Sequence, residues 1–171
     1  IDQVDTSLMQ YLSRLDIDNV QRLLSSVIVI NSVSVMVLHL PISHMMVKFN
    51  LSGRMYIGLL ILLFSQVVFF FCNEKFISGW LIATMILTIG EIIVFPTSSI
   101  IIDKLAPASE KGNYFAISSL SSVGWILAPI VGGLIMDNIS FAALCVFCAM
   151  LCSVLVYLYR YKLFTHSGLN S

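Results

Sequence analysis

Charged side chains are scarce in this chain. Of its 171 residues, 11% are charged and 58% are hydrophobic, whereas soluble globular proteins average about 25% and about 45–50%. This composition excludes a disordered chain and an ordinary soluble domain. Nine Lys and Arg balance nine Asp and Glu, so no net field attracts a polyanion, and we expect no nucleic-acid partner.

The chain has only four cysteines, Cys72, Cys145, Cys148 and Cys152. The last three recur at helical spacing within an apolar run, where a thiolate is costly and no His or carboxylate lies nearby in sequence to complete a metal site. A metal or redox site is the less favoured alternative to small packing residues. No apolar run carries paired carboxylates, His-rich metal spacing or a nucleophile beside a base. We therefore expect no enzyme, no bound metal and no cofactor.

What the chain does contain is long apolar runs. A helix needs about 20 residues to cross the hydrocarbon core of a bilayer, and five runs approach or exceed this length: 24–47, 55–72, 77–102, 114–136 and 139–159. The sequence therefore predicts an all-α polytopic membrane bundle of five helices over residues 23–162. The first run is too long for a signal peptide and no cleavage site follows it. Residues 1–22 are too polar to span, so we expect them to end a preceding helix and form an outer loop.

Basic residues in short loops predict the orientation of the spans. One side collects six of them, namely Lys48, Arg54, Lys104, Lys111, Arg160 and Lys162, and the other collects Arg14, Arg22 and Lys75. The larger group predicts a cytoplasmic C-terminus, with residues 163–171 as a cytoplasmic tail. Because the chain begins at Ile1, we expect a fragment or a processed chain of a multi-pass protein of the bacterial inner or plasma membrane.

Polar residues fall on one side of three of the five runs. The stripes are Ser25, Ser32, His39 and Ser43 in the first run, Thr84, Thr88, Glu91 and Ser98 in the third, and Ser118, Ser122 and Trp125 in the fourth. A polar stripe within a span needs a partner helix or water beside it, which favours a shared aqueous cavity. The alternative is that each hydroxyl bonds to a carbonyl of its own helix. The second and fifth runs have few polar residues, and we expect them to face lipid.

Glu91 is the least expected residue inside a span, because an acidic side chain there costs about 2.5–3.5 kcal/mol. It is a candidate proton carrier or cation site, and the alternative is a structural tie to a neighbouring helix. His39 is a candidate for a pH-linked step or a hydrogen-bonding residue at the interface. Trp125 either stacks on a flat substrate or fills space. Asn31 lies off the stripe of its run, so we expect it to bond to a neighbouring helix.

Small residues form a separate stripe in the fourth run: Ser121, Gly124, Ala128, Gly132 and the adjoining Gly133. Small side chains at this spacing let two helices approach closely in lipid. Pro129 lies within the stripe and predicts a bend in the helix.

Several short motifs occur in order along the chain: Gly90-Glu91, Pro96, Leu105-Ala-Pro, Gly112-Asn-Tyr, then Gly124, Pro129 and Gly132-Gly133, ending at Asp137. With these motifs the chain resembles the major facilitator superfamily, and more narrowly the C-terminal half of a twelve-helix bacterial drug:proton antiporter. The resemblance implies that the five runs are helices 8 to 12, with the first, third and fourth lining a central cavity. The loop over residues 43–54 keeps only Lys48, Gly53 and Arg54 of the gating motif often found there in the family.

The favoured function is therefore secondary transport, with proton-coupled export of small amphipathic compounds or drugs by alternating access. Its partners are a small-molecule substrate, protons, membrane lipid and a six-helix N-terminal half missing from this chain. Two alternatives remain: a nutrient carrier of the same fold for a sugar, amino acid or peptide, and a membrane fragment or assembly partner that transports nothing.

Overall fold

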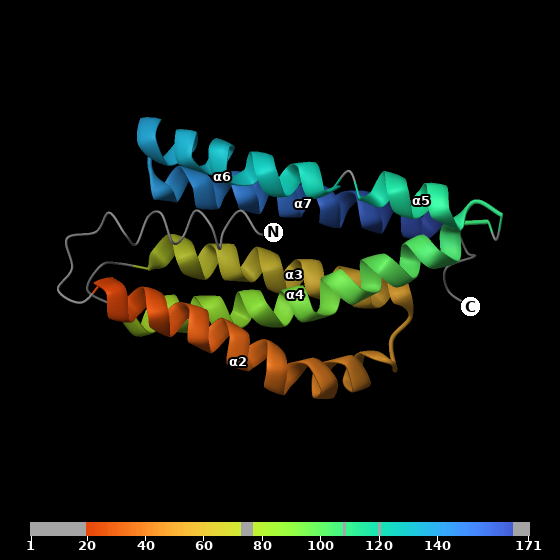
Figure 1. Ribbon diagram of the computed structural model, residues 1–171, viewed down its shortest axis with the longest axis horizontal. Coiled ribbons are helices and arrows are strands. Elements are labelled where there is room, and N and C mark those ends of the chain that lie inside the picture. The colour runs from red at the N-terminus through yellow and green to blue at the C-terminus, as the bar shows by residue number, and fades with distance from the viewer. Residues whose placement is uncertain (1–19, 73–76, 108, 120, 166–171) are drawn as a thin grey trace.

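A computed structural model describes residues 20–72, 77–107, 109–119 and 121–165. These residues form six helices and no strand: α2 (Val20–Met46), α3 (Leu51–Phe71), α4 (Ile77–Leu105), α5 (Lys111–Ser118), α6 (Ser121–Asn138) and α7 (Phe141–Thr165) (Figure 1). The predicted all-α bundle is confirmed.

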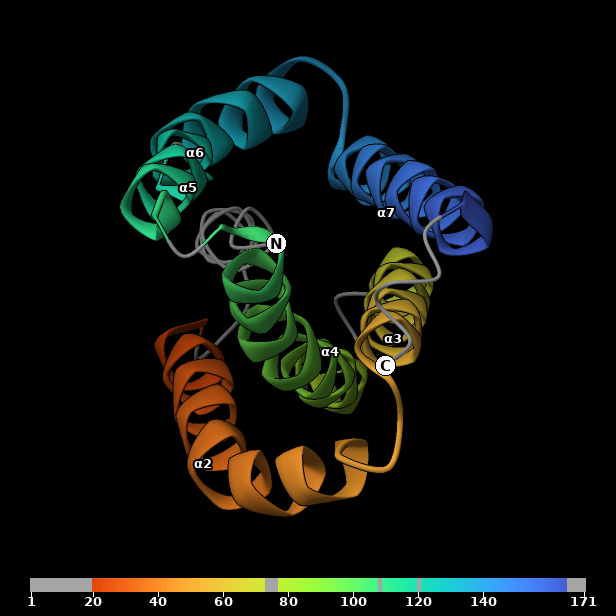
Figure 2. The ribbon, with the colours of Figure 1, turned by 90° about the vertical axis from the view of Figure 1, so that its right-hand side faces the viewer.

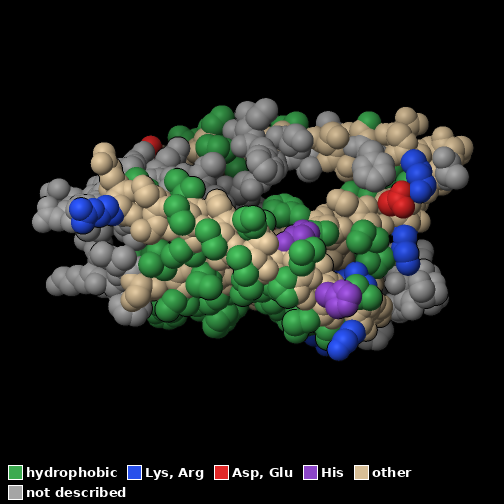
Figure 3. All heavy atoms as spheres, turned by 60° about the horizontal axis from the view of Figure 1, so that its bottom comes forward, with side chains coloured by type: hydrophobic (Ala, Val, Ile, Leu, Met, Phe, Trp, Pro, Cys, Tyr) green, Lys and Arg blue, Asp and Glu red, His purple; other side chains and the backbone are tan. Residues whose placement is uncertain are grey.

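Four of the helices are long and apolar enough to cross a membrane, over Leu24–Met46, Leu51–Phe71, Ser78–Leu105 and Phe141–Arg160. In Figure 3 hydrophobic side chains occupy the middle of the face that α2 presents, and Lys and Arg lie toward its two ends. This distribution is typical of a protein whose middle lies in hydrocarbon.

The run expected at 114–136 is divided into two helices. α5 ends at Ser118 and α6 begins at Ser121, and four of the five residues 118–122 are serine. Serine hydroxyls compete with the helical hydrogen bonds of the backbone, which is a physical reason for the interruption. The break therefore lies two turns before Pro129, the residue for which the sequence predicts a bend.

α4 occupies the middle of the bundle (Figure 2). It packs most extensively on α3 and then on α2, while α3 packs on α7 with its other flank, and α6 packs on α7. The prediction that the second run faces lipid therefore applies to one side of α3 only. Its other side is among the most buried surfaces of the described chain, with Leu59, Leu62 and Phe69 at most 1% exposed.

Two glycines allow the close approach of α3 and α4. A Cβ on Gly58 of α3 would lie 2.6 Å from Val94 Cγ2, and a Cβ on Gly90 of α4 would lie 2.7 Å from Leu62 Cγ and Cδ2. Real Cβ contacts are never this short, so each glycine is a point where one helix lies against the side chains of the other.

The turn between α2 and α3 is closed by Asn50 and Arg54. The Asn50 side chain accepts a hydrogen bond from the Gly53 backbone N–H at 2.9 Å and caps the N-terminus of α3. The Arg54 guanidinium donates to Phe49 O at 2.9 Å and to Val47 O at 3.2 Å. Gly53 and Arg54 therefore have a local structural role in this turn, whereas Lys48 is exposed.

Candidate functional site: the polar interface of α2 and α4

Three residues of the predicted α4 stripe are buried together. Thr84 and Thr88 are fully buried, and Glu91 is 8% exposed. Their spacing places them on adjoining turns of one helix face. Glu91 is also the middle residue of α4, because 14 of the 29 residues of this helix precede it and 14 follow it. Among the described residues of the four membrane-length helices, the only other Asp or Glu is Asp103 near the end of α4.

α2 supplies the facing side of this interface. Five residues that recur every three or four positions are buried or half-buried: Leu24, Val27, Asn31, Ser34 and Leu38. This spacing is typical of one helix seam against a neighbour, and α2 packs on α4. Two members of the seam, Asn31 and Ser34, are polar, and Ser34 is buried.

A side-chain hydrogen bond joins the two helices at the level of Thr88. Its hydroxyl oxygen lies 2.7 Å from Asn31 Oδ1 and 2.8 Å from Thr84 O. The prediction that Asn31 bonds to a neighbouring helix is confirmed. A hydroxyl carries one proton, so these two acceptors share or exchange a single donor.

Three other hydroxyls of the stripes bond within their own helix. Thr84 donates to Trp80 O at 2.8 Å, Ser98 to Phe95 O at 2.8 Å, and Ser25 to Gln21 O at 2.8 Å. The alternative interpretation of the polar stripes is thus confirmed for these residues. Because these hydroxyls are satisfied within their own helices, they do not by themselves indicate water beside the helices.

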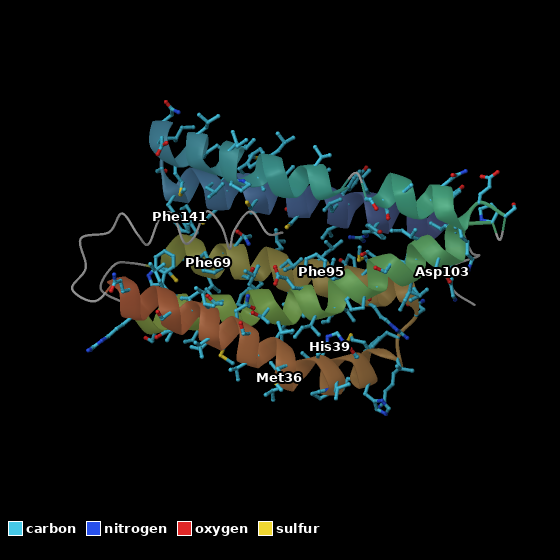
Figure 4. All side chains as sticks on the ribbon, viewed as in Figure 1. Met36, His39, Phe69, Phe95, Asp103 and Phe141 are labelled. Atoms are coloured by element: carbon cyan, nitrogen blue, oxygen red, sulfur yellow. The ribbon has the colours of Figure 1, made fainter. Side chains whose placement is uncertain are left out.

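The predicted stripe of α2 lies beside the seam, and most of it is exposed. Ser25, Ser32 and His39 are exposed, and Ser43 is half-buried. Figure 4 shows His39 toward α4 and Met36 on the opposite side of α2. Beyond His39, Pro41 lies inside α2, and in Figures 1 and 2 this end of the helix diverges from α4. Proline removes a helical hydrogen bond, which allows such a bend.

The site residues predicted in the fourth run are only partly described. Ser118 is half-buried at the end of α5. The side chains of Ser122 and Trp125 lie outside the described part, so their place relative to Glu91 stays a prediction, and the side chain of Ser121, predicted to pack between helices, also lies outside it. The structure brings Thr84, Thr88 and Glu91 together with Asn31 of α2.

The small-residue stripe of α6 differs along its length. Gly132 is buried, and Ala128, Pro129 and Gly133 are half-buried. Gly124 is exposed, and no described atom lies within 4 Å of a Cβ built on it. In the described chain, tight contacts between helices occur at Gly58 and Gly90. Neither glycine belongs to a small-residue stripe, because neither has a small residue four positions away.

The burial of two polar residues of α3 was not predicted from the sequence. Ser65 is fully buried and donates to Leu62 O at 2.7 Å, and Gln66 is 3% exposed. Their presence in an otherwise apolar run was a signal that this run has a buried side.

The cysteines have the expected packing role. Within the described residues all four are free, and Cys145 and Cys148 belong to the hydrophobic core. The same part of the chain holds no group of three or more His, Cys, Asp or Glu that could bind a metal ion.

Comparison with known proteins supports membership of the major facilitator superfamily. The chain is 27% identical over 135 residues to the uncharacterized MFS-type transporter YdeE of Escherichia coli (strain K12), covering 79% of this chain and 34% of that protein. It is 24% identical over 136 residues to the uncharacterized MFS-type transporter YqjV of Bacillus subtilis (strain 168), covering 79% and 33%. The chain thus spans about a third of the length of these relatives.

A third relative, the uncharacterized MFS-type transporter YttB of Bacillus subtilis (strain 168), is 32% identical over 96 residues, which is 56% of this chain and 24% of that protein. No family model and no solved structure matches the chain.

Proposed function

We propose that this chain is the C-terminal part of a secondary transporter that exports small amphipathic compounds in exchange for protons. Three similarities to MFS-type transporters and four membrane-length helices support the transporter class. The relatives are about three times as long as the matched region, and we propose that an N-terminal half of six helices completes the cavity. The excess of basic residues in the loops favours a cytoplasmic C-terminus in the cell membrane.

The observation that carries the proposal is the burial of Glu91 in the middle of α4. A carboxyl in low dielectric is costly when charged, and residues of this kind mark ion and substrate pathways in membrane proteins. Glu91 therefore takes and releases the coupling proton, or pairs with a cationic substrate in its charged form. His39, Ser118, Ser122 and Trp125 are proposed cavity residues of the same pathway.

Efflux of a fluorescent lipophilic cation tests this proposal, measured in cells that express the full-length protein with and without a proton gradient. We expect Glu91→Gln to reduce gradient-driven efflux about tenfold or more, which corresponds to at least about 1.4 kcal/mol of lost coupling or binding. Glu110→Gln is the matched control, because Glu110 undergoes the same chemical change at an exposed position before α5.

Three outcomes are informative. Efflux that fails only in Glu91→Gln supports a proton-coupled exporter with Glu91 in the coupling or cation site. Efflux that is equal in parent and Glu91→Gln rules out that role for Glu91. A parent protein that reaches the membrane but moves no lipophilic cation favours the alternative, a nutrient carrier of the same fold.

A further inference from the structure

A hydrogen bond between Asn31 and Thr88 joins α2 and α4. Asn31 lies off the predicted polar stripe of α2, so the sequence did not place this contact in the candidate site. α2 and α4 run in the same direction (Figure 1), and the hydrogen bond of Asn31 with Thr88 sets their register. Because the two helices are parallel, the turn that follows Asn31 in α2 lies beside the turn that follows Thr88 in α4. The turn that follows Thr88 carries Glu91, and the turn that follows Asn31 carries the buried Ser34.

The Thr88 hydroxyl has two acceptors at almost equal distance, Asn31 Oδ1 at 2.7 Å and Thr84 O at 2.8 Å. Since it has one proton, it can bond across to α2 or back to its own helix. When α2 separates from α4, the donor retains the Thr84 carbonyl and is not left unsatisfied in the interior. The contact is therefore a tie between two helices that is released at low cost.

We propose that Asn31 is a positioning residue for Glu91, acting through the Thr88 hydroxyl as this releasable tie between α2 and α4. The proposal rests on the proposed function of Glu91 and adds the residues that fix the place of its carboxyl. With the tie made, α2 holds the turn that carries Glu91. With the tie released, α2 moves away from that turn and changes the polarity around the carboxyl.

The described elements around Glu91 carry few other titratable or charged groups. α4 packs on α3, α2 and α5, and it meets α7 at the ring pair of Trp80 and Phe141, three turns before Glu91. The titratable and charged groups of α2 to α5 lie toward helix ends or in exposed positions: Arg22, His39 and His44 on α2, Arg54, Tyr56 and Cys72 around α3, Asp103 and Lys104 on α4, and Lys111 and Tyr114 on α5. Those of α7 are Cys145, Cys148, Cys152, Tyr157, Tyr159 and Arg160. His39, two turns beyond Asn31, is the nearest along α2.

The test uses the purified full-length protein and measures its thermal unfolding midpoint between pH 4 and pH 9. The difference between the midpoints of the parent and of Glu91→Gln, followed as a function of pH, reports the titration of Glu91. We expect Asn31→Leu and Thr88→Val to move that titration by at least about half a pH unit, which corresponds to roughly 0.7 kcal/mol. The double variant is expected to move it no further than either single one, because both changes remove one contact.

Three further variants separate positioning from general packing. Thr88→Ser keeps the hydroxyl and is expected to restore the parent titration. Thr97→Val removes a buried α4 hydroxyl that bonds to Ile93 O of its own helix, and it is expected to leave the titration in place. His44→Gln removes an exposed titratable group from the last turn of α2, and it is also expected to leave the titration in place.

Equal shifts in Asn31→Leu and Thr88→Val, with rescue by Thr88→Ser, support the proposal. Additive shifts, a shift in Thr97→Val of the same size, or an unmoved titration overturn it, and so does a parent protein whose unfolding shows no component that depends on Glu91. The unfolding measurement does not depend on transport. Failure of the efflux experiment alone therefore refutes the proposed function, whereas the role of Asn31 is tested separately by the titration of Glu91.

Discussion

Gly90 lies directly against Leu62 of the neighbouring helix. A Cβ on Gly90 would be 2.7 Å from Leu62 Cγ and Cδ2, and 3.2 Å from Leu62 N. The last atom belongs to the backbone of α3, so a rotation of the Leu62 side chain does not relieve the contact. Because Glu91 is the next residue along α4, this contact also determines how the helix presents the carboxyl.

The first prediction is that Gly90→Ala destabilises the protein. Replacement of glycine by alanine within a helix normally gains about 1 kcal/mol, but overpacking a close contact costs typically about 1–3 kcal/mol. We expect a net loss, measured as a lower thermal unfolding midpoint of the purified protein. Gly112→Ala is the control, since no described atom lies within 4 Å of its Cβ. A Gly90→Ala protein that unfolds at or above the parent midpoint would contradict the close approach.

The second prediction concerns Gly124, where the sequence favours close helix packing. In the described chain its Cβ position is open, so we expect Gly124→Ala to be neutral or to stabilise the helix by up to about 1 kcal/mol. The same thermal measurement in the full-length protein tests this. A loss comparable with that of Gly90→Ala would mean that Gly124 is covered by a segment outside the described residues, as the small-residue stripe predicts.

The sequence was sufficient to predict the membrane bundle and its four long helices. Runs of about 20 apolar residues leave few alternatives in hydrocarbon, so α2, α3, α4 and α7 follow from composition. The break between Ser118 and Ser121 was not predicted, because hydropathy values do not include the competition of serine hydroxyls for hydrogen bonds with backbone groups. The packing of α3 on two neighbours was missed for a similar reason, since Leu and Phe are equally suited to lipid and to a helix interface.

The candidate site was also predicted from the sequence only in part. The cost of an acidic residue in a span identified Glu91 without any structure, and the position of Asn31 off its stripe correctly predicted a bond between helices. The partner of Asn31 in this hydrogen bond depends on how α2 and α4 are aligned along their lengths. A single sequence does not contain that register, so the Asn31 and Thr88 pair required the three-dimensional structure.

The third prediction is that Arg54 holds the turn between α2 and α3. Its guanidinium donates to two backbone carbonyls, Val47 O and Phe49 O. Lysine has no planar fork to satisfy both acceptors, so Arg54→Lys and Arg54→Ala are both expected to destabilise the turn by about 1 kcal/mol. Faster cleavage of the native protein within residues 47–50 by a soluble protease measures this. Lys48→Ala is the control at an exposed position of the same turn, and equal cleavage of all three variants would show that Arg54 has no special role.

The fourth prediction concerns Trp80, which is 1% exposed where α3, α4 and α7 meet. Its ring centroid lies 6.1 Å from that of Phe69 and 5.5 Å from that of Phe141, within the range of favourable aromatic pairs. We expect Trp80→Ala to cost roughly 3–5 kcal/mol through the cavity it leaves, and Trp80→Phe to cost less because a ring remains. Phe71→Ala is the control, since Phe71 is 76% exposed on α3 and its loss leaves no internal cavity. Thermal unfolding of the three variants measures these costs, and a Phe71→Ala protein as unstable as Trp80→Ala would contradict the aromatic junction of the three helices.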